Sequence, residues 1–236
     1  MYTDNQRYLD VCANFADLGL ITDIVRVIKR GKEGAALLCR AEASLGAEYC
    51  VVKIFKDEQF RNFKNDRGYL EGKVWKRRDL LHLVQVKSEL WVETEFNSLK
   101  KLHAAGLPVP KPYDQAGPAV CMEFIGEGDE PAPMLKNAHP SRDEAAGLFE
   151  KLIGAADGML AGGIVHGDLS PFNILYHRGA PVIIDFPQSV PANTNRFAFD
   201  LFCRDVESIC EYFSRFGIEA DGRVLAEEIW GRYYII

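Results

Sequence analysis

The sequence predicts an α+β fold of two lobes, a small β-rich lobe followed by a helical one. Runs of Val, Ile and Leu broken by glycine fill residues 20–55, whereas patterns of helical spacing dominate after residue 140. A chain of 236 residues is long enough for one large domain or for two small lobes. Hydrophobic residues make up 47% of it, which is enough for a full core and too many for a disordered chain.

Composition also limits which cellular compartment and which classes of partner we expect for this chain. The chain has 28 basic and 34 acidic side chains, and the net charge of −6 argues against nonspecific nucleic-acid binding by the whole surface, though not by a local basic patch. The six cysteines form no close CxxC pair, so we expect reduced core residues rather than a disulfide framework or a zinc site. No signal pattern opens the chain and no apolar run approaches about 20 residues, so we expect a cytoplasmic protein with no membrane partner.

The sequence pattern of the first part of the chain predicts a β-sheet. Residues 1–27 are expected to be a short N-terminal extension, with a weakly helical pattern over residues 3–18. A turn with two glycines, Gly31 and Gly34, separates the first two of three expected strands. These strands cover residues 20–30, 35–43 and 48–55.

Residues 56–80 change character, because charged residues alternate there with aromatic ones. Seven basic and three acidic residues lie between Arg61 and Asp79, a local balance of +4. This basic loop, residues 61–79, could dock on phosphate groups of a ribosomal or other ribonucleoprotein particle, or its charges could simply solvate a loop. A helix from about 88 to 104 is predicted next from apolar residues at helical spacing. They are Trp91, Val92, Phe96, Leu99 and Leu102.

The second half of the chain is mainly helical. A buried strand over residues 119–125 closes the first lobe, residues 28–125, and Gly126-Glu127-Gly128 is the expected linker to the second lobe, residues 126–236. Ser141-Arg142-Asp143-Glu144 is a capping box, which predicts the start of a long helix ending at Gly162-Gly163. The remaining elements are a short strand over residues 181–184 and helices over about 199–216 and 223–234.

Five polar residues occur where a phosphate-transfer site would need them. Lys53 lies within an apolar strand, where a lysine needs a partner, and Glu95 on the next helix is a candidate for that role. The loop IVHGDLSPFNIL holds Asp168 and Asn173 five residues apart, and Asp185 follows a strand. A lysine neutralises phosphate oxygens, a glutamate holds it, oxygen ligands bind magnesium, and one aspartate orients the nucleophile. This order along the chain is that of the protein-kinase template.

Taken singly, these residues allow plainer interpretations. Lys53 could be an exposed edge-strand lysine, and Asp185 a cap at a strand end. Asp168 and Asn173 could be an Asx-turn pair. His166 is better explained as a structural hydrogen-bonding residue than as a base, because the aspartate supplies the base. The occurrence of all five in the required order favours the phosphate-transfer site.

The nucleotide pocket has weaker candidates. Met122 would lie at the back of an adenine pocket, with the carbonyl of Glu123 and the N–H of Ile125 facing the adenine edge; the alternative is a buried strand that runs into a linker. Gly31-Lys32-Glu33-Gly34 would be a phosphate-covering turn, or simply a turn.

The same motifs resemble the RIO family of atypical serine/threonine protein kinases, over about residues 28–215. VVKIFK is similar to the family's lysine strand, and MEFIGEGDEPAPMLKNA to its hinge. HGDLSPFNILY and IIDFPQSV are the most specific matches, and RDVESICEYFSRFG is similar to the C-terminal helix. The resemblance implies a bilobal protein-kinase-like fold with a truncated helical C-lobe, since neither a long activation segment nor Ala-Pro-Glu follows Asp185.

The resemblance also implies roles for individual residues. Lys53, held by Glu95, would contact the phosphates of ATP, with Gly31, Lys32 and Glu33 in the phosphate-binding loop and Ser170 nearby. Asp168 would be the catalytic aspartate. Asn173 and Asp185 would hold Mg²⁺, or Mn²⁺ as an alternative metal. In some family members this metal-binding aspartate is thought to become a phosphoaspartate, and the family serves small-ribosomal-subunit maturation in archaea and eukaryotes.

Three functions are therefore under consideration. The first is a RIO-type kinase or ATPase that transfers the γ-phosphate of ATP to Ser or Thr, to itself or to water. The second is a small-molecule kinase of the aminoglycoside-phosphotransferase kind, which also uses His-Gly-Asp-Leu and Asn; only about 50 residues follow Asp185, few for an acceptor-binding insert. The third is a nucleotide-gated switch that docks on a ribonucleoprotein through the basic loop.

Overall fold

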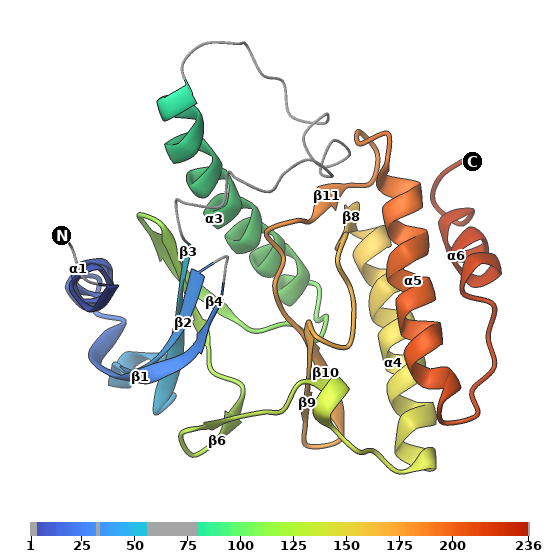
Figure 1. The fold of residues 1–236 in the computed structure, drawn as a ribbon, viewed down its shortest axis with the longest axis horizontal. Coiled ribbons are helices and arrows are strands. Elements are labelled where there is room, and N and C mark those ends of the chain that lie inside the picture. The colour runs from blue at the N-terminus through green and yellow to red at the C-terminus, as the bar shows by residue number, and fades with distance from the viewer. Residues whose placement is uncertain (1–3, 32–33, 56–79, 236) are drawn as a thin grey trace. The chain divides into compact units, whose positions relative to one another are not determined.

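The structure is a computed structural model that describes residues 4–31, 34–55 and 80–235. These residues form two compact units. The first contains the described residues up to 55 together with 80–100 and 110–131, and the second contains 101–109 and 132–235. One unit is built on a β-sheet and the other on helices, which confirms the predicted α+β class (Figure 1).

The first unit is organised by a five-stranded antiparallel sheet in the order β1-β2-β3-β5-β4. Successive side chains of a strand point to opposite faces, so Cys50, Val52 and Ile54 of β3 are buried on one face and Lys53 belongs to the other. The strands are β1 (Ile21–Arg30), β2 (Gly34–Ala41), β3 (Tyr49–Phe55), β4 (Pro112–Ala116) and β5 (Ala119–Glu123), with a short 3-10 turn η1 (Ala43–Leu45) between β2 and β3.

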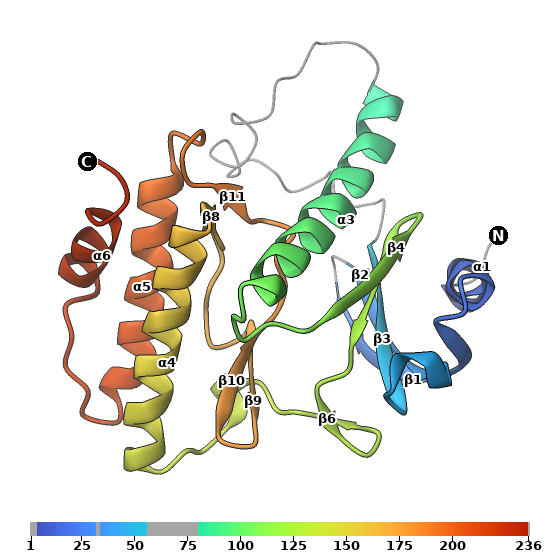
Figure 2. The same cartoon turned by 180° about the vertical axis from the view of Figure 1, so that it is seen from behind.

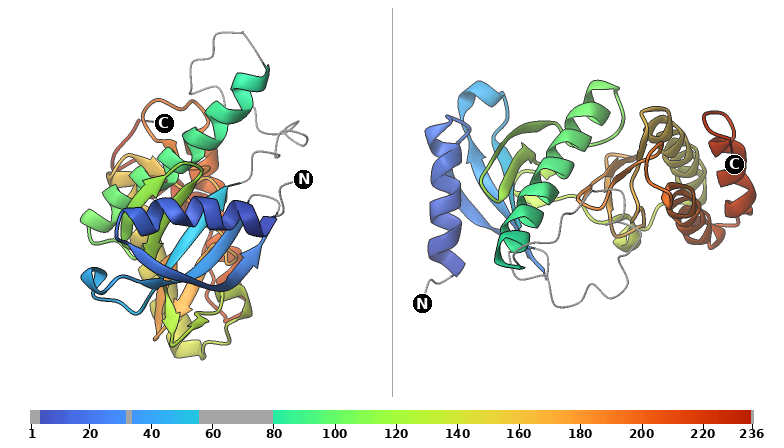
Figure 3. Two further views of the ribbon diagram at one scale, coloured as in Figure 1. Left: turned by 90° about the vertical axis from the view of Figure 1, so that its left-hand side faces the viewer. Right: turned by 90° about the horizontal axis from the view of Figure 1, so that it is seen from above.

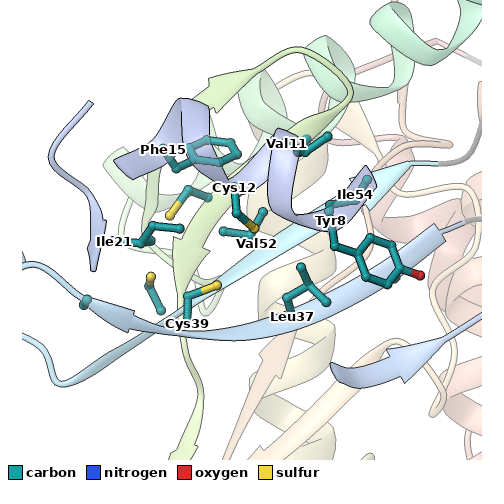
Figure 4. Packing of buried hydrophobic residues seen from close by; sticks show 14 residues of the cluster. Tyr8, Val11, Cys12, Phe15, Ile21, Leu37, Cys39, Val52 and Ile54 are labelled. Carbon is teal, nitrogen blue, oxygen red and sulfur yellow. The ribbon is translucent and has the colours of Figure 1, made fainter. Parts of the chain in front are cut away.

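Helix α1 (Asp4–Asp17) lies across one face of this sheet (Figure 3). Its buried side chains recur at i, i+3, i+4 and i+7, the spacing that places them on one helix face. They are Tyr8, Val11, Cys12 and Phe15, and they join Leu37, Cys39, Val52 and Ile54 of the sheet in one apolar cluster (Figure 4). Residues expected to form an extension therefore contribute to the core of the first unit. All six cysteines are buried and free, as predicted.

The pairing of β2 with β3 depends on a glycine. Gly34 pairs with Phe55, two residues beyond Lys53. A Cβ atom at Gly34 would lie 1.9 Å from the carbonyl oxygen of Ile54, far inside van der Waals contact. The strands can approach this closely only because residue 34 has no side chain.

Helix α3 (Leu80–Ala104) is longer than the sequence pattern indicated and begins eight residues before the expected start at 88. Residues 126–128, expected to be a linker, belong to a small hairpin of the first unit. Gly126 permits it, because a Cβ there would lie 2.2 Å from the carbonyl oxygen of Glu130. The hairpin consists of β6 (Gly126–Glu127) and β7 (Glu130–Pro131).

The second unit is built around helices α4 (Arg142–Ala161) and α5 (Ala198–Ser214), which run side by side (Figure 2). The predicted capping box is present: Glu144 N–H donates to Ser141 Oγ, and Ser141 N–H donates to Glu144 Oε2. Gly162 ends α4, also as predicted. The other elements are η3 (Leu135–Asn137), β8 (Ile164–Val165), β9 (Ile174–His177), β10 (Ala180–Ile183), β11 (Val190–Pro191) and α6 (Gly222–Trp230).

Aromatic side chains join the helices of the second unit. Phe149 of α4 and Phe213 of α5 meet edge to face with ring centroids 5.6 Å apart. The ring centroid of Phe202 of α5 lies 5.9 Å from that of Trp230 of α6. Among the described helices, none combines the length and the apolar character that a bilayer crossing needs.

The close approach of β2 and β3 gives the first prediction. Gly34→Ala should lower the free energy of unfolding by at least about 2 kcal/mol, because the new methyl group must push the two backbones apart. Gly147→Ala in α4 is the matched control: nothing lies within 4 Å of a Cβ there, and alanine is the better helix former, so stability should rise by about 0.5–1 kcal/mol. Urea denaturation measures both, and a Gly34→Ala midpoint equal to that of the wild type would contradict this account.

Candidate functional site

The first group of predicted site residues is an ion pair between β3 and α3. Lys53 Nζ lies 2.8 Å from Glu95 Oε2. The Glu95 side chain is 1% exposed and that of Lys53 is 21% exposed. A carboxylate buried to this degree is costly without a cation, so Lys53 and Glu95 fix each other's position. The aromatic ring of Phe55, whose centroid is 5.0 Å from Nζ, adds a further favourable contact for the ammonium group.

The other candidates in the first unit lie around the sheet. The turn before β2 is closed by the N–H of Gly31, which donates to the carbonyl oxygen of Gly34 at 2.9 Å. Lys32 and Glu33 lie outside the described residues. Met122 is buried on β5 opposite Val51.

The last residue of β5, Glu123, is bonded to the segment before β4. Glu123 N–H donates to the carbonyl oxygen of Lys111, and Lys111 N–H donates to the Glu123 carboxylate at 3.1 Å. Ile125, two residues on, is buried. Glu123 is therefore held against the segment that precedes β4.

The second group lies on the loop between β8 and β9. Asn173 Nδ2 donates to two oxygens of Asp168, to its carbonyl oxygen at 2.9 Å and to its carboxylate Oδ2 at 3.0 Å. Asn173 N–H in turn donates to the carbonyl oxygen of Ser170, which closes the turn between them. These bonds join the two residues directly and differ from an Asx-turn, in which a side-chain oxygen accepts the backbone N–H two residues on. They hold the Asp168 carboxylate in a fixed direction.

His166 is a structural residue of this loop. It is buried, and its Nε2 lies 3.2 Å from the carbonyl oxygen of Ile184, to which it donates. Its Nδ1 accepts the N–H of Asp168. The two bonds together require the neutral tautomer with the proton on Nε2. Both ring nitrogens are therefore engaged, which leaves His166 unsuited to act as a base.

Asp185 follows β10 in an unusual backbone conformation. Its φ of 74° is in the left-handed region, which costs energy for a residue other than glycine. The preceding residue, Ile184, donates its N–H to the carbonyl oxygen of Asn173 at 2.9 Å, which brings Asp185 next to the Asp168 loop. The negative charge of Asp185 raises the pKa of the Asp168 carboxyl, so the two carboxylates lie close enough to repel each other.

These surroundings alter the acidity of Asp168. Removal of solvent raises the pKa of its carboxyl, the hydrogen bond from Asn173 lowers it, and the charge of Asp185 raises it again, with a net rise. The residue still has exposed surface. A partly desolvated carboxylate with a raised pKa, held by a side-chain amide, is suited to accepting a proton.

Sequence analysis missed one residue of this site, Asp205 of α5. Its carboxylate accepts the N–H of Gly167 and the N–H of Leu169, each at 2.8 Å, one on each oxygen. The side chain is buried. Burial raises the pKa of Asp205 to about 7, against the opposing effect of the two backbone N–H groups. A signal was present: an aspartate on the buried face of the helix, between Phe202 and Ile209, needs a partner.

Gly167 explains why the loop can wrap around Asp205. Its φ is 81°, in the left-handed region, and a Cβ there would lie 3.0 Å from the carbonyl oxygen of Gln188. Glycine therefore relieves two constraints at the position before the candidate catalytic aspartate.

The donor set suits a hard divalent cation. Carboxylate and amide oxygens, as on Asp185 and Asn173, are the ligands that Mg²⁺ prefers. Within the described part of the chain, no three His, Cys, Asp or Glu side chains converge into a complete metal site. Mg²⁺ is commonly held by one or two protein oxygens, with water and phosphate oxygens of a substrate as its other ligands.

Comparisons with known proteins identify relatives of this chain. Residues 38–225 match a family model described as "RIO domain". Human serine/threonine-protein kinase RIO1 is 32% identical over 210 residues, which cover 85% of this chain and 35% of that protein. The RIO-type serine/threonine-protein kinase Rio1 of Thermoplasma acidophilum is 34% identical over 189 residues, which cover 78% of this chain and 95% of the relative.

Solved structures extend the likeness to the fold. The Rio2 kinase of Chaetomium thermophilum, in a structure described as an ADP/Mg²⁺-phosphoaspartate complex, has a TM-score of 0.71. Its sequence is 23% identical, and the match covers 93% of this chain and 65% of that one. The chain spans about a third of the length of the human and Caenorhabditis elegans relatives.

The raised pKa of Asp205 predicts how stability depends on pH. The pKa of Asp205 is about 7 in the folded chain, against an ordinary value of 3.8. Between these two pH values the folded chain therefore binds a proton at Asp205 that the unfolded chain releases. Its contribution is present in full below about pH 4 and is lost as the pH rises through about 7. The free energy of unfolding of the wild type minus that of Asp205→Asn should therefore fall across this window.

Urea denaturation at several pH values across the window measures that difference. Asp143→Asn, at an exposed position in the first turn of α4, is the matched loss of one carboxylate. A difference for Asp205→Asn that is constant with pH, or that rises, would contradict the raised pKa of Asp205.

Proposed function

The chain belongs to the RIO family of serine/threonine-protein kinases, and from that premise we propose that it is an Mg²⁺- and ATP-dependent phosphotransferase. It transfers the γ-phosphate to a Ser or Thr hydroxyl of a protein, to itself or to water. The observation that carries this proposal is the Asp168 carboxylate held by Asn173 next to Asp185. Phosphoryl transfer depends on positioning and on charge stabilisation, which these residues can supply.

Lys53 is proposed as the residue that contacts the phosphates of ATP. Its ion pair with the buried Glu95 supports this role, because Glu95 holds the ammonium group in one place without covering all of it. A preorganised cation needs no rearrangement when negative charge arrives. Gly31 and Ser170, at the two turns described above, are proposed to lie near the phosphates.

Asp168 is proposed as the catalytic aspartate. Its raised pKa supports a role in accepting the proton of the attacking hydroxyl or water, and the Asn173 amide fixes which way the carboxylate faces. Asn173 and Asp185 are proposed to hold Mg²⁺, with Mn²⁺ as the alternative. The metal ion would neutralise charge on the phosphate oxygens when bound.

The adenine side of the site is proposed at the end of β5. Met122 would contact the base, and the backbone of Glu123 and Ile125 would face its polar edge. Support comes from the burial of Met122 and Ile125 on either side of Glu123.

The phosphate acceptor is a separate part of this proposal. The Chaetomium thermophilum Rio2 structure is described as containing a phosphoaspartate. We propose Asp185 as the self-acceptor of this chain: a carboxylate oxygen forms the bond to phosphorus as the bond to ADP breaks. Water would then release phosphate, which makes ATP hydrolysis the net reaction.

Three other expectations have different support. The small-molecule kinase alternative gains none from the relatives described above, which are named as serine/threonine-protein kinases. Docking on a ribonucleoprotein rests on residues 61–79, which lie outside the described residues. A cytoplasmic location is supported by the six buried, free thiols.

Asp168→Asn tests the proposed function. The amide keeps the shape of the side chain but cannot accept the proton, so turnover of ATP should fall by about 100-fold or more. Binding of Mg²⁺-ATP should remain within about threefold of the wild type, because Asp168 is assigned no role in holding the nucleotide.

Release of labelled phosphate, transfer to protein and calorimetric ATP binding together measure these effects. The control is again Asp143→Asn, which should keep wild-type turnover. Undiminished turnover in Asp168→Asn would remove the assigned role, and a wild-type chain that neither binds nor turns over ATP would remove the function.

A further inference from the structure

Helix α1 ends 21 residues before the start of the RIO family match, yet it contacts the strands that carry the proposed phosphate-binding residues. We infer that α1, through Arg7, is a positioning element for Lys53 and for the glycine turn, and that ATP affinity depends on it. This inference rests on the proposed function, since it assigns to Arg7 a part in nucleotide binding. Arg7 acts through the backbone of β3 and is not itself assigned a contact with ATP.

The central contact joins α1 to the end of β3. Arg7 Nη2 donates to the carbonyl oxygen of Phe55 at 3.1 Å. Phe55 is the last residue of β3, two positions after Lys53. A guanidinium that donates to a carbonyl oxygen makes a charge-assisted hydrogen bond, stronger than an ordinary backbone bond. Arg7 therefore secures the strand close to the lysine that the mechanism requires.

The next residue of α1, Tyr8, contacts the residue that precedes the glycine turn. The guanidinium of Arg30 lies over the ring of Tyr8, with Cζ 5.6 Å from the ring centroid. Arg30 is the last residue of β1 and directly precedes Gly31. Gly34, at the far end of the same turn, pairs with Phe55. Two neighbouring residues of one helix thus contact Arg30, which precedes the turn, and Phe55, the strand partner of the glycine that follows it.

α1 is itself firmly placed, which is what a positioning element requires. Val11, Cys12 and Phe15 are buried in the apolar cluster against the sheet (Figure 4). The side chains that meet α1 alternate with Lys53 along β3, so α1 and Glu95 act from opposite faces of the strand. Glu95 fixes the ammonium group of Lys53, and α1 fixes the backbone from which Lys53 extends.

A purely structural role for Arg7 makes a different prediction. If the bond to Phe55 only stabilises the unit, its loss lowers the unfolding temperature and leaves the properties of the folded enzyme unchanged. If it positions Lys53, the folded enzyme binds ATP less tightly. A hydrogen bond to a charged group contributes enough free energy that its loss can weaken ATP binding measurably. If part of that free energy is lost from ATP binding, the ATP KM rises by about three- to tenfold.

The experiment compares Arg7→Ala, Arg7→Lys and Arg40→Ala in the full chain. Arg40 is the matched control: it is an exposed arginine of the same sheet, paired with Glu48 and lying over Tyr49 at the opposite end of β3. Initial rates at varied ATP give KM and kcat, and thermal unfolding shows that each variant is folded at the assay temperature. Hydrogen exchange of the peptide containing Lys53 and Phe55 reports directly on the strand end.

We expect Arg7→Ala to raise the ATP KM about three- to tenfold, with kcat within about twofold, and to speed exchange at the end of β3. Arg7→Lys, which keeps a charged donor, should recover at least half of the loss, and Arg40→Ala should match the wild type. An unchanged KM for Arg7→Ala, or an equal rise for Arg40→Ala, would overturn the inference. If Arg7→Ala is not folded, Arg7→Gln replaces it and the same KM rise is required.

The design separates this inference from the proposed function. A wild-type chain without ATP turnover would overturn the function, and the inference with it. Wild-type turnover with unaffected Arg7 variants would overturn the inference alone.

Discussion

The buried carboxylate of Asp205 is the interaction on which the candidate site depends most. It accepts two backbone N–H groups, from the residues on either side of Asp168, and so fixes the backbone from which Asp168 extends. A buried backbone N–H without an acceptor is costly, and here one side chain satisfies two of them. His166 and Asn173 complete the arrangement, because they bind the N–H, the carbonyl and the carboxylate of the same residue. Asp168 is thereby held through its N–H, its carbonyl oxygen and one carboxylate oxygen.

The period of the β-strand imposes a second constraint, on the first unit. Alternate residues of β3 face opposite sides, so the strand can contribute Cys50, Val52 and Ile54 to an apolar core and still present Lys53 to α3. A shift of register by one residue would bury the lysine among thiols and aliphatic side chains. The apolar cluster under α1 therefore helps to determine which way Lys53 points, although no member of the cluster is charged.

Much of this could be predicted from sequence because the signals are local. The capping box at Ser141, the end of α4 at Gly162 and the strand-borne Lys53 each follow from a few neighbouring residues. Asp168 and Asn173 were found because five-residue spacing within one loop is visible in the chain. The structural role of His166 is also predicted from the sequence, because the nearby aspartate supplies the base. The two hydrogen bonds of the His166 ring agree with that role.

What could not be predicted depends on distant partners. Asp205 lies 36 residues after Leu169, and only the packing of α5 brings its carboxylate to that backbone. Arg7 and Phe55 are 48 residues apart, and α1 reads as a weak helix because its stability comes from the sheet it covers. The sequence predicts a linker at Gly126, where the structure has a hairpin, because glycine is common in both. The close approach of the Glu130 carbonyl oxygen depends on the folded hairpin.

The central claim is that this chain binds ATP with a metal held by Asn173 and Asp185. A crystal structure with a non-hydrolysable ATP analogue and Mn²⁺, with the metal located by anomalous scattering, tests it most directly. The account predicts a metal peak with the Asn173 side-chain oxygen and an Asp185 carboxylate oxygen at about 2.0–2.3 Å, completed by phosphate oxygens. Bound nucleotide whose metal is coordinated by neither residue would contradict it.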